Sequence, residues 1–165
     1  PRGGEGLIRF INSNSTVPVV KHDKGLCHTF IDKDADLEKA VKIAVNAKTQ
    51  RVGVCNAMET LLVDYAIADE VLPLLKKEFD KAETQLKGCG ITNSIIEVEE
   101  ATEEDYNTEY LANILNIKIV NGVFEAINHI SRFGSGHSEA IITENYTTAE
   151  KFLNKVDASS VYLNA

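Results

Sequence analysis

Cys55 is the residue whose type and surroundings point most directly to chemistry. It lies in the stretch QRVGVCNA, residues 50–57, which follows a helical pattern and contains a glycine suited to a turn. Lys48 and Arg51 lie within seven residues upstream of it, and nearby cations favour the thiolate form of a cysteine. A single cysteine is also commonly a small buried hydrophobe, so the residues alone leave both a nucleophile and a buried thiol open.

Lys48, Arg51 and Asn56 are the candidates for binding an anionic substrate beside that thiol. A guanidinium binds a phosphate or a carboxylate through two parallel hydrogen bonds, and an amide side chain is a hydrogen-bond donor as well. The alternative is that the two cations complement the negative end of a helix dipole. The sequence leaves both interpretations open.

The remaining cysteines do not indicate a further site. Cys27 falls within an apolar strand pattern, and Cys89 lies between two glycines. Three cysteines without a CxxC pair indicate free thiols in a reducing compartment, and we therefore expect a cytoplasmic protein. No group of histidines, cysteines and carboxylates has the spacing of metal ligands, so we predict no metal site.

The apolar residues that must position this chemistry alternate between strand and helix spacing. Short runs rich in β-branched residues predict strands at 17–20, 26–31, 60–63, 114–120, 140–143 and 160–163. Apolar residues at helical spacing predict helices at 37–45, 67–79, 123–130 and 149–156. The expected helix boundaries are an N-cap at Asp34 or Asp36, an N-cap at Thr147 or Thr148, and a terminator at Gly134.

This alternation of strand and helix is the pattern of βαβ units. It predicts an α/β fold in three layers, with a mostly parallel sheet and helices on both of its faces. Strands buried on both sides should be uniformly apolar, and residues 61–63 and 140–142 fit that expectation. The stretch 97–107 carries six acidic residues and is expected to be an exposed loop. Within it, Thr102 and Asp105 have the spacing of a helix capping box.

The charge balance limits the class of partner. The 165 residues contain 17 Lys and Arg against 25 Asp and Glu, which gives a net charge of −8. Such a field repels nucleic acids and anionic lipid surfaces, so we expect neither as a partner. The apolar runs are too short for a transmembrane helix. A content of 44% hydrophobic and 25% charged residues is typical of a globular domain.

Several stretches of the chain together resemble one known family. AKTQRVGVCNAMETLLV, residues 47–63, resembles the catalytic-cysteine segment of the glutamate-5-semialdehyde dehydrogenases, or γ-glutamyl phosphate reductases, a branch of the aldehyde dehydrogenase superfamily. The other stretches that match the family pattern in order are PRGGEGLIRF, VPVVKHDKGLCHTFIDKDADLEKAV, ATEEDYNTEYL, GSGHSEAIITENY and DASSVYLNA. The resemblance therefore covers essentially the whole chain.

The resemblance implies an enzyme that uses NADPH to reduce L-glutamate 5-phosphate, a small molecule, to L-glutamate 5-semialdehyde and phosphate in proline biosynthesis. Cys55 would be its nucleophile. A thiolate attacks an acyl phosphate, expels phosphate and forms a thioester, which accepts a hydride more readily than a carboxylate does. The backbone N–H of Cys55 would contribute to an oxyanion hole, with a second donor from a nucleotide-binding part that precedes Pro1.

The resemblance also assigns residues to the cofactor NADP(H). Glu109 aligns with the superfamily glutamate that accepts hydrogen bonds from the nicotinamide ribose hydroxyls. Gly3 and Gly4 resemble the glycine turn at a helix N-terminus that faces the cofactor, and a plain turn is the alternative. Where hydrolytic relatives carry a water-activating glutamate, this chain has Lys21 or His22. We interpret these two residues as protection against thioester hydrolysis; the alternative is that they only end a strand.

The resemblance implies a chain in two parts. Residues 1–16 would be the end of the nucleotide-binding domain and residues 17–165 the catalytic domain. Most of the cofactor domain and the C-terminal oligomerisation arm would be absent, so the chain alone is expected to be inactive. The whole enzyme is expected to be a homo-oligomer that can associate with glutamate 5-kinase. Two other functions stay open, a non-catalytic α/β module and a thiol redox protein that kept the fold.

Overall fold

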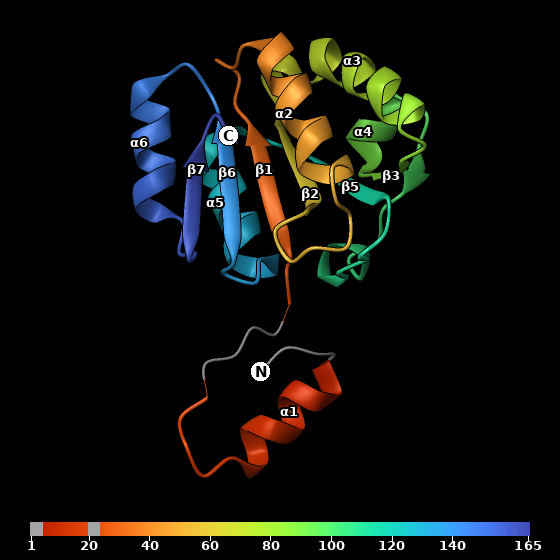
Figure 1. The fold of residues 1–165 in the computed structure, drawn as a ribbon. Coiled ribbons are helices and arrows are strands. Elements are labelled where there is room, and N and C mark those ends of the chain that lie inside the picture. Colours follow the sequence, from red (N-terminus) through yellow and green to blue (C-terminus); the bar gives the residue numbers. More distant parts are fainter. Residues whose placement is uncertain (1–4, 20–23) are drawn as a thin grey trace.

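Helices and strands alternate along the chain, as the apolar spacing predicts (Figure 1). The computed structural model describes residues 5–19 and 24–165. In chain order the elements are α1 (Glu5–Asn14), β1 (Cys27–Ile31), α2 (Leu37–Thr49), β2 (Met58–Asp64), η1 (Tyr65–Ile67), α3 (Ala68–Lys81), β3 (Gln85–Gly88), α4 (Gly90–Ile95), β4 (Glu99–Glu100), η2 (Asp105–Asn107), β5 (Ile114–Val120), α5 (Gly122–Phe133), β6 (Ser138–Ile142), α6 (Tyr146–Lys155) and β7 (Ser160–Leu163). The two η elements are short 3₁₀ turns.

One sheet runs through the centre of the fold. Its strands follow the order β4-β3-β5-β2-β1-β6-β7, and each neighbouring pair in the described residues is parallel. In the central register, His28 of β1 lies opposite Thr60 of β2 and Glu139 of β6. The predicted α/β class is confirmed, and the sheet is parallel throughout these residues because every connection is a crossover.

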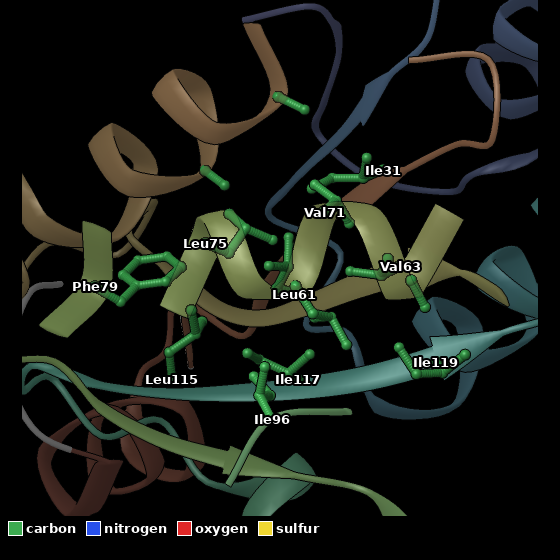
Figure 2. Close-up of a cluster of buried hydrophobic side chains, with 14 of the residues drawn as sticks. Ile31, Leu61, Val63, Val71, Leu75, Phe79, Ile96, Leu115, Ile117 and Ile119 are labelled. Carbon is green, nitrogen blue, oxygen red and sulfur yellow. The ribbon is translucent and has the colours of Figure 1, made fainter. Parts of the chain in front are cut away.

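Helices cover both faces of the sheet, which produces the three predicted layers. On one face α2, α3 and α4 bury the larger apolar cluster against the sheet, where Val71, Leu75 and Phe79 of α3 meet Leu61 and Ile117 of the strands (Figure 2). On the other face α5 and α6 bury a second cluster against β1, β2, β5 and β6. Removal of these side chains from water is the main force that holds the layers together.

Most helix ends lie where the sequence places them. Asp36 is the N-cap of α2, and its side chain accepts a backbone hydrogen bond, while α5 ends at Gly134. The predicted caps of α6, Thr147 and Thr148, are wrong. Asn145 is the N-cap, because its side-chain oxygen accepts a hydrogen bond from the backbone N–H of Thr148.

The sequence missed the elements at one edge of the sheet. β3 has a single fully apolar buried side chain, Leu86, and β4 consists of two exposed glutamates. Short polar edge strands of this kind lack the apolar run that predicts a strand. Conversely, residues 17–19 of the predicted first strand are not in a strand, and Val20 lies outside the described residues. A β-branched run becomes a strand only where a neighbouring strand completes its backbone hydrogen bonds.

The acidic stretch 97–107 is largely exposed, as predicted. The two hydrogen bonds of its capping box are present, since the Thr102 amide donates to Asp105 Oδ2 at 2.7 Å and the Asp105 amide donates to Thr102 Oγ1 at 3.3 Å. The short helix η2 itself begins at Asp105 and has Glu104 as its N-cap. Asp105 is not simply solvated, because its Oδ1 also accepts a hydrogen bond from Lys87 Nζ at 2.8 Å. This bond, together with those from Thr102, holds the pKa of Asp105 below its usual range, although partial burial opposes the shift.

The loop that carries Cys55 lies at the amino-terminal edge of the sheet. In a parallel sheet the helix after a strand returns to the edge where the strands begin, so α2 runs back to the start of β2. Residues 50–57 connect the end of α2 to Met58, the first residue of β2. The beginnings of β1 and β6 lie next to β2 at the same edge.

The helix α1 lies apart from the sheet in Figure 1. The division of the chain into residues 1–16 and residues 17–165 stays a prediction.

Candidate functional site

Cys55 is exposed, in contrast to Cys27, which is buried. Cys55 lies within a turn whose backbone is closed by a hydrogen bond from the Ala57 amide to the Val54 carbonyl at 3.0 Å. Of the two interpretations that the sequence left open, the buried hydrophobe is therefore wrong. A solvent-accessible sulfur in a defined turn is what a nucleophile needs.

Gly25 and Cys27 hold the backbone of Cys55 in place. A Cβ atom on Gly25 would lie 2.1 Å from the Cys55 carbonyl oxygen, so the two backbones are packed more closely than any side chain permits. The Cys27 thiol donates a hydrogen bond to the same carbonyl oxygen, with 3.2 Å between Sγ and O. Burial raises the pKa of Cys27 to about 12, so its thiol keeps the proton that it donates.

Glu109 reaches this place from a distant part of the chain. Its Oε1 accepts a hydrogen bond at 2.8 Å from the backbone N–H of Gly25, 84 residues away in sequence. Gly25 is therefore in contact with Cys55 on one side and with the Glu109 carboxylate on the other. The structure brings together the predicted nucleophile and the predicted cofactor-binding carboxylate.

A cavity of about 450 Å³ lies beside the loop, between α2 and the beginnings of β1 and β6. Arg51 lines it, and so do Val54 and Asn56, the two neighbours of Cys55. Lys42 also lines it, with its Nζ in an ion pair with Glu38 Oε1 at 2.5 Å, so Arg51 is the cation assigned to a ligand here. The cavity thus has positive charge and amide donors in an otherwise acidic chain, a combination that suits an anionic small molecule.

The structure does not bring Lys48 to that cavity. Its side chain is fully buried, and its Nζ lies 3.0 Å from Glu59 Oε2, whose side chain is 2% exposed. Burial lowers the pKa of Lys48, and the attraction of Glu59 opposes the shift. The expected contact between Lys48 and a substrate does not agree with this burial, because its charge is already compensated inside the protein.

Four residues that the resemblance singles out cannot be placed. Gly3, Gly4, Lys21 and His22 lie outside the described residues. In the part of the chain that the structure describes, no group of three or more His, Cys, Asp or Glu side chains is arranged to hold a metal ion. No helix among these residues is long and apolar enough to cross a membrane.

Sequence reasoning missed Gly25, Cys27 and Glu59 as parts of the site. A glycine directly before a strand signals a close backbone approach, so Gly25 could have been noticed. Nothing in the pattern singles out Cys27, which has the spacing of any buried strand residue. Glu59 could have been found as a charged residue inside an otherwise apolar strand, since a buried charge needs a partner.

Comparisons with known proteins agree with the resemblance. A curated γ-glutamyl phosphate reductase from Sulfurimonas denitrificans is 72% identical over 165 residues, which are 100% of this chain and 40% of that protein. The crystal structure of γ-glutamyl phosphate reductase from Thermotoga maritima matches with a TM-score of 0.98 and 52% identity, over 100% of this chain and 40% of that chain. No protein-family model matches the chain.

A more distant solved structure shows the fold alone. An acetylating aldehyde dehydrogenase from Geobacillus thermoglucosidasius matches with a TM-score of 0.75 and 23% identity, over 99% of this chain and 45% of that chain. The predicted resemblance is confirmed along the whole chain, and so is the predicted fold type. The chain spans 40% of the length of the curated relatives that it matches.

Proposed function

We propose that this chain, which resembles γ-glutamyl phosphate reductases along its whole length, is the cysteine-bearing catalytic part of such an enzyme. The reaction is the NADPH-dependent reduction of L-glutamate 5-phosphate to L-glutamate 5-semialdehyde and phosphate, a step of proline biosynthesis. One observation carries the proposal: an exposed Cys55 beside a cationic cavity, in a chain 72% identical throughout to a protein of that name.

The first chemical step would join the Cys55 sulfur to the carbonyl carbon of the acyl phosphate. The bond from that carbon to the phosphate oxygen breaks, inorganic phosphate leaves, and a thioester remains on Cys55. The backbone N–H of Cys55 would stabilise the negative charge that develops on the carbonyl oxygen. Gly25 and Cys27 support this role, since they fix the carbonyl group of Cys55 and with it the orientation of the turn.

The second step would release the aldehyde. NADPH, when bound, would supply the hydride that reduces the thioester carbon. The carbon–sulfur bond would then break, and Cys55 would leave as a thiolate. Glu109 would hold the nicotinamide ribose. A carboxylate has about four acceptor sites, so the bond from Gly25 to Oε1 leaves capacity for two ribose hydroxyls. Gly3 and Gly4 remain proposed contacts of the same cofactor.

Arg51 and Asn56 would bind the anionic ends of the substrate. Both line the cavity beside Cys55, and a guanidinium matches the geometry of a phosphate or carboxylate. Lys48 has no part in this proposal.

The setting of the whole enzyme is proposed on the same resemblance. It would be a cytoplasmic homo-oligomer in which further segments supply most of the cofactor site, the second oxyanion donor and the oligomerisation arm. Association with glutamate 5-kinase would protect an unstable acyl phosphate between two active sites.

The reverse reaction tests the proposal in the full-length protein that contains this chain. NADPH absorbance is followed while glutamate 5-semialdehyde, NADP⁺ and inorganic phosphate are supplied. We expect turnover that requires phosphate and that is lost in Cys55→Ala. The control Cys89→Ser should keep this turnover, because Cys89 is half-buried and directly follows the last residue of β3, whereas Cys55 precedes the first residue of β2. Turnover without phosphate, or turnover by Cys55→Ala, would contradict the proposal.

A further inference from the structure

A buried ion pair closes the base of the Cys55 loop. Lys48 lies in the last turn of α2 and Glu59 is the second residue of β2, and their charged atoms are 3.0 Å apart. Their side chains are 0% and 2% exposed. Charged groups are buried this completely only where partners compensate the loss of water, so the pair has to be explained by what it holds in place.

The second oxygen of Glu59 holds the segment that carries Glu109. Glu59 Oε1 accepts a hydrogen bond from the backbone N–H of Leu111 at 3.3 Å. Leu111 is 50% exposed, so apolar packing does not anchor this residue. Its φ angle is +51°, in the left-handed region that non-glycine residues rarely adopt. A conformation of this kind persists only where its surroundings impose it, and the Glu59 carboxylate is the group that binds its amide.

A second polar contact holds the same segment at Tyr110, the residue between Glu109 and Leu111. The Tyr110 hydroxyl lies 2.7 Å from Asp105 Oδ1 and 3.1 Å from Asn116 Oδ1. Residues 110 and 111 are thus fixed in two directions, and the residue before them presents its carboxylate to Gly25 at 2.8 Å.

We propose that Lys48 and Glu59 are positioning residues, which hold Glu109 where it can bind the ribose of the nicotinamide cofactor. Lys48 holds Glu59 in place, Glu59 binds the Leu111 amide, and the resulting backbone conformation aims Glu109 at Gly25 and the Cys55 turn. Neither residue touches cofactor or substrate. The inference rests on the proposed function, because it assigns a support to the cofactor site of that enzyme.

Two double variants of the full-length protein separate this role from simple packing. Lys48→Met with Glu59→Leu replaces the pair by apolar side chains and removes the acceptor for the Leu111 amide. Lys48→Met with Glu59→Gln also removes both charges, but the Gln carbonyl keeps that acceptor. Lys76→Met with Asp80→Leu, in an exposed ion pair on α3, is the matched control.

The measurement is the NADP⁺ dissociation constant by fluorescence titration. We expect it to rise about tenfold in the Leu variant, the effect of one hydrogen bond to a charged group, and to stay within about twofold of the parent in the Gln variant and the control. The rate at which iodoacetamide alkylates Cys55 without cofactor should not change, since Gly25 and Cys27 still hold that turn. Equal constants for the Leu and Gln variants overturn the inference.

Further variants cover failure of folding and failure of the premise. If the double variants do not fold, Tyr110→Phe, which removes one hydroxyl from the second contact, decides: a raised dissociation constant supports the positioning network, and an unchanged one overturns it. If Glu109→Ala weakens NADP⁺ binding and the Leu variant does not, this inference is overturned and the proposed function is not. If the parent protein binds no NADP⁺, the proposed function fails and the inference with it.

Discussion

The Cys27 thiol donates a hydrogen bond to the backbone carbonyl of Cys55, across 3.2 Å, so one cysteine of the chain fixes the backbone of another. Cys27 is the first residue of β1, and Cys55 is exposed in the turn before β2. A side chain of the strand β1 therefore holds the backbone of the candidate active site, in addition to the hydrogen bonds that β1 makes with its neighbouring strands. A buried thiol that seemed to serve only packing thus acquires a definite role.

We predict that Cys27→Ala slows the reaction that depends on Cys55 and lowers the free energy of unfolding by about 1 to 2 kcal/mol, through the lost hydrogen bond and a small cavity. Cys27→Ser keeps a donor at this position and should recover most of the activity. The measurements are kcat in the full-length protein and urea denaturation. Identical kcat values for the Ala and Ser variants would show that the hydrogen bond does not matter.

Gly25→Ala is predicted to lower kcat by about a hundredfold, because displacement of a reacting group by about 1 Å has an effect of that size. The added Cβ would lie 2.1 Å from the Cys55 carbonyl oxygen, which is backbone and cannot rotate away. Gly53→Ala is the control, since a Cβ at this glycine of the same loop meets no atom within 4 Å. Steady-state kinetics of both variants checks the prediction, and comparable kcat values would refute it.

Arg51→Met is predicted to raise KM for phosphate in the reverse reaction by about tenfold, the loss expected for a charge-assisted hydrogen bond. Arg51 lines the cavity next to the Cys55 turn. The NADP⁺ dissociation constant should stay unchanged, because Glu109 and not Arg51 is assigned to the cofactor. Arg132→Met, which removes an exposed arginine on α5 that pairs with Glu103, should alter neither quantity.

Acid is predicted to destabilise the protein through His129, which packs against Tyr106 and Phe133. Burial lowers the pKa of His129 from 6.5 to about 3, so between these two pH values the unfolded chain binds a proton that the folded chain does not. The contribution of this group to the free energy of unfolding is complete above pH 6.5. It falls as the pH is lowered, by about 2 kcal/mol between pH 7 and pH 5.

His129→Phe removes that proton and keeps the aromatic packing. The Nε2 atom that it eliminates has no hydrogen-bond partner among the described residues. Urea denaturation at pH 7 and pH 5 should therefore show a smaller loss of stability in the variant than in the parent. Equal losses in the two proteins would mean that His129 is not the group that responds to acid.

The sequence by itself determined the local elements and the identity of the reactive group. The apolar residues of β2, β5 and β6 and the amphipathic patterns of α2, α3 and α5 follow from spacing, because each element has to bury one face or both. Cys55 and Arg51 were recognised from residue type and neighbourhood, and the family resemblance added Glu109. The sequence did not decide whether Cys55 is exposed, since the same stretch could place its thiol in an exposed turn or in the core.

Only the tertiary structure decided which of these residues meet. Gly25 and Glu109 are 84 residues apart and become neighbours through the order of strands in the sheet. Periodicity does not encode that order, because it describes a residue's face within its own element and not the element beside it. For the same reason Lys48, a cation near the reactive cysteine in sequence, turned out to be paired with Glu59 inside the protein. Contacts between distant segments depend on the complete packing of the chain, so only the folded chain brings the residues of the candidate site together.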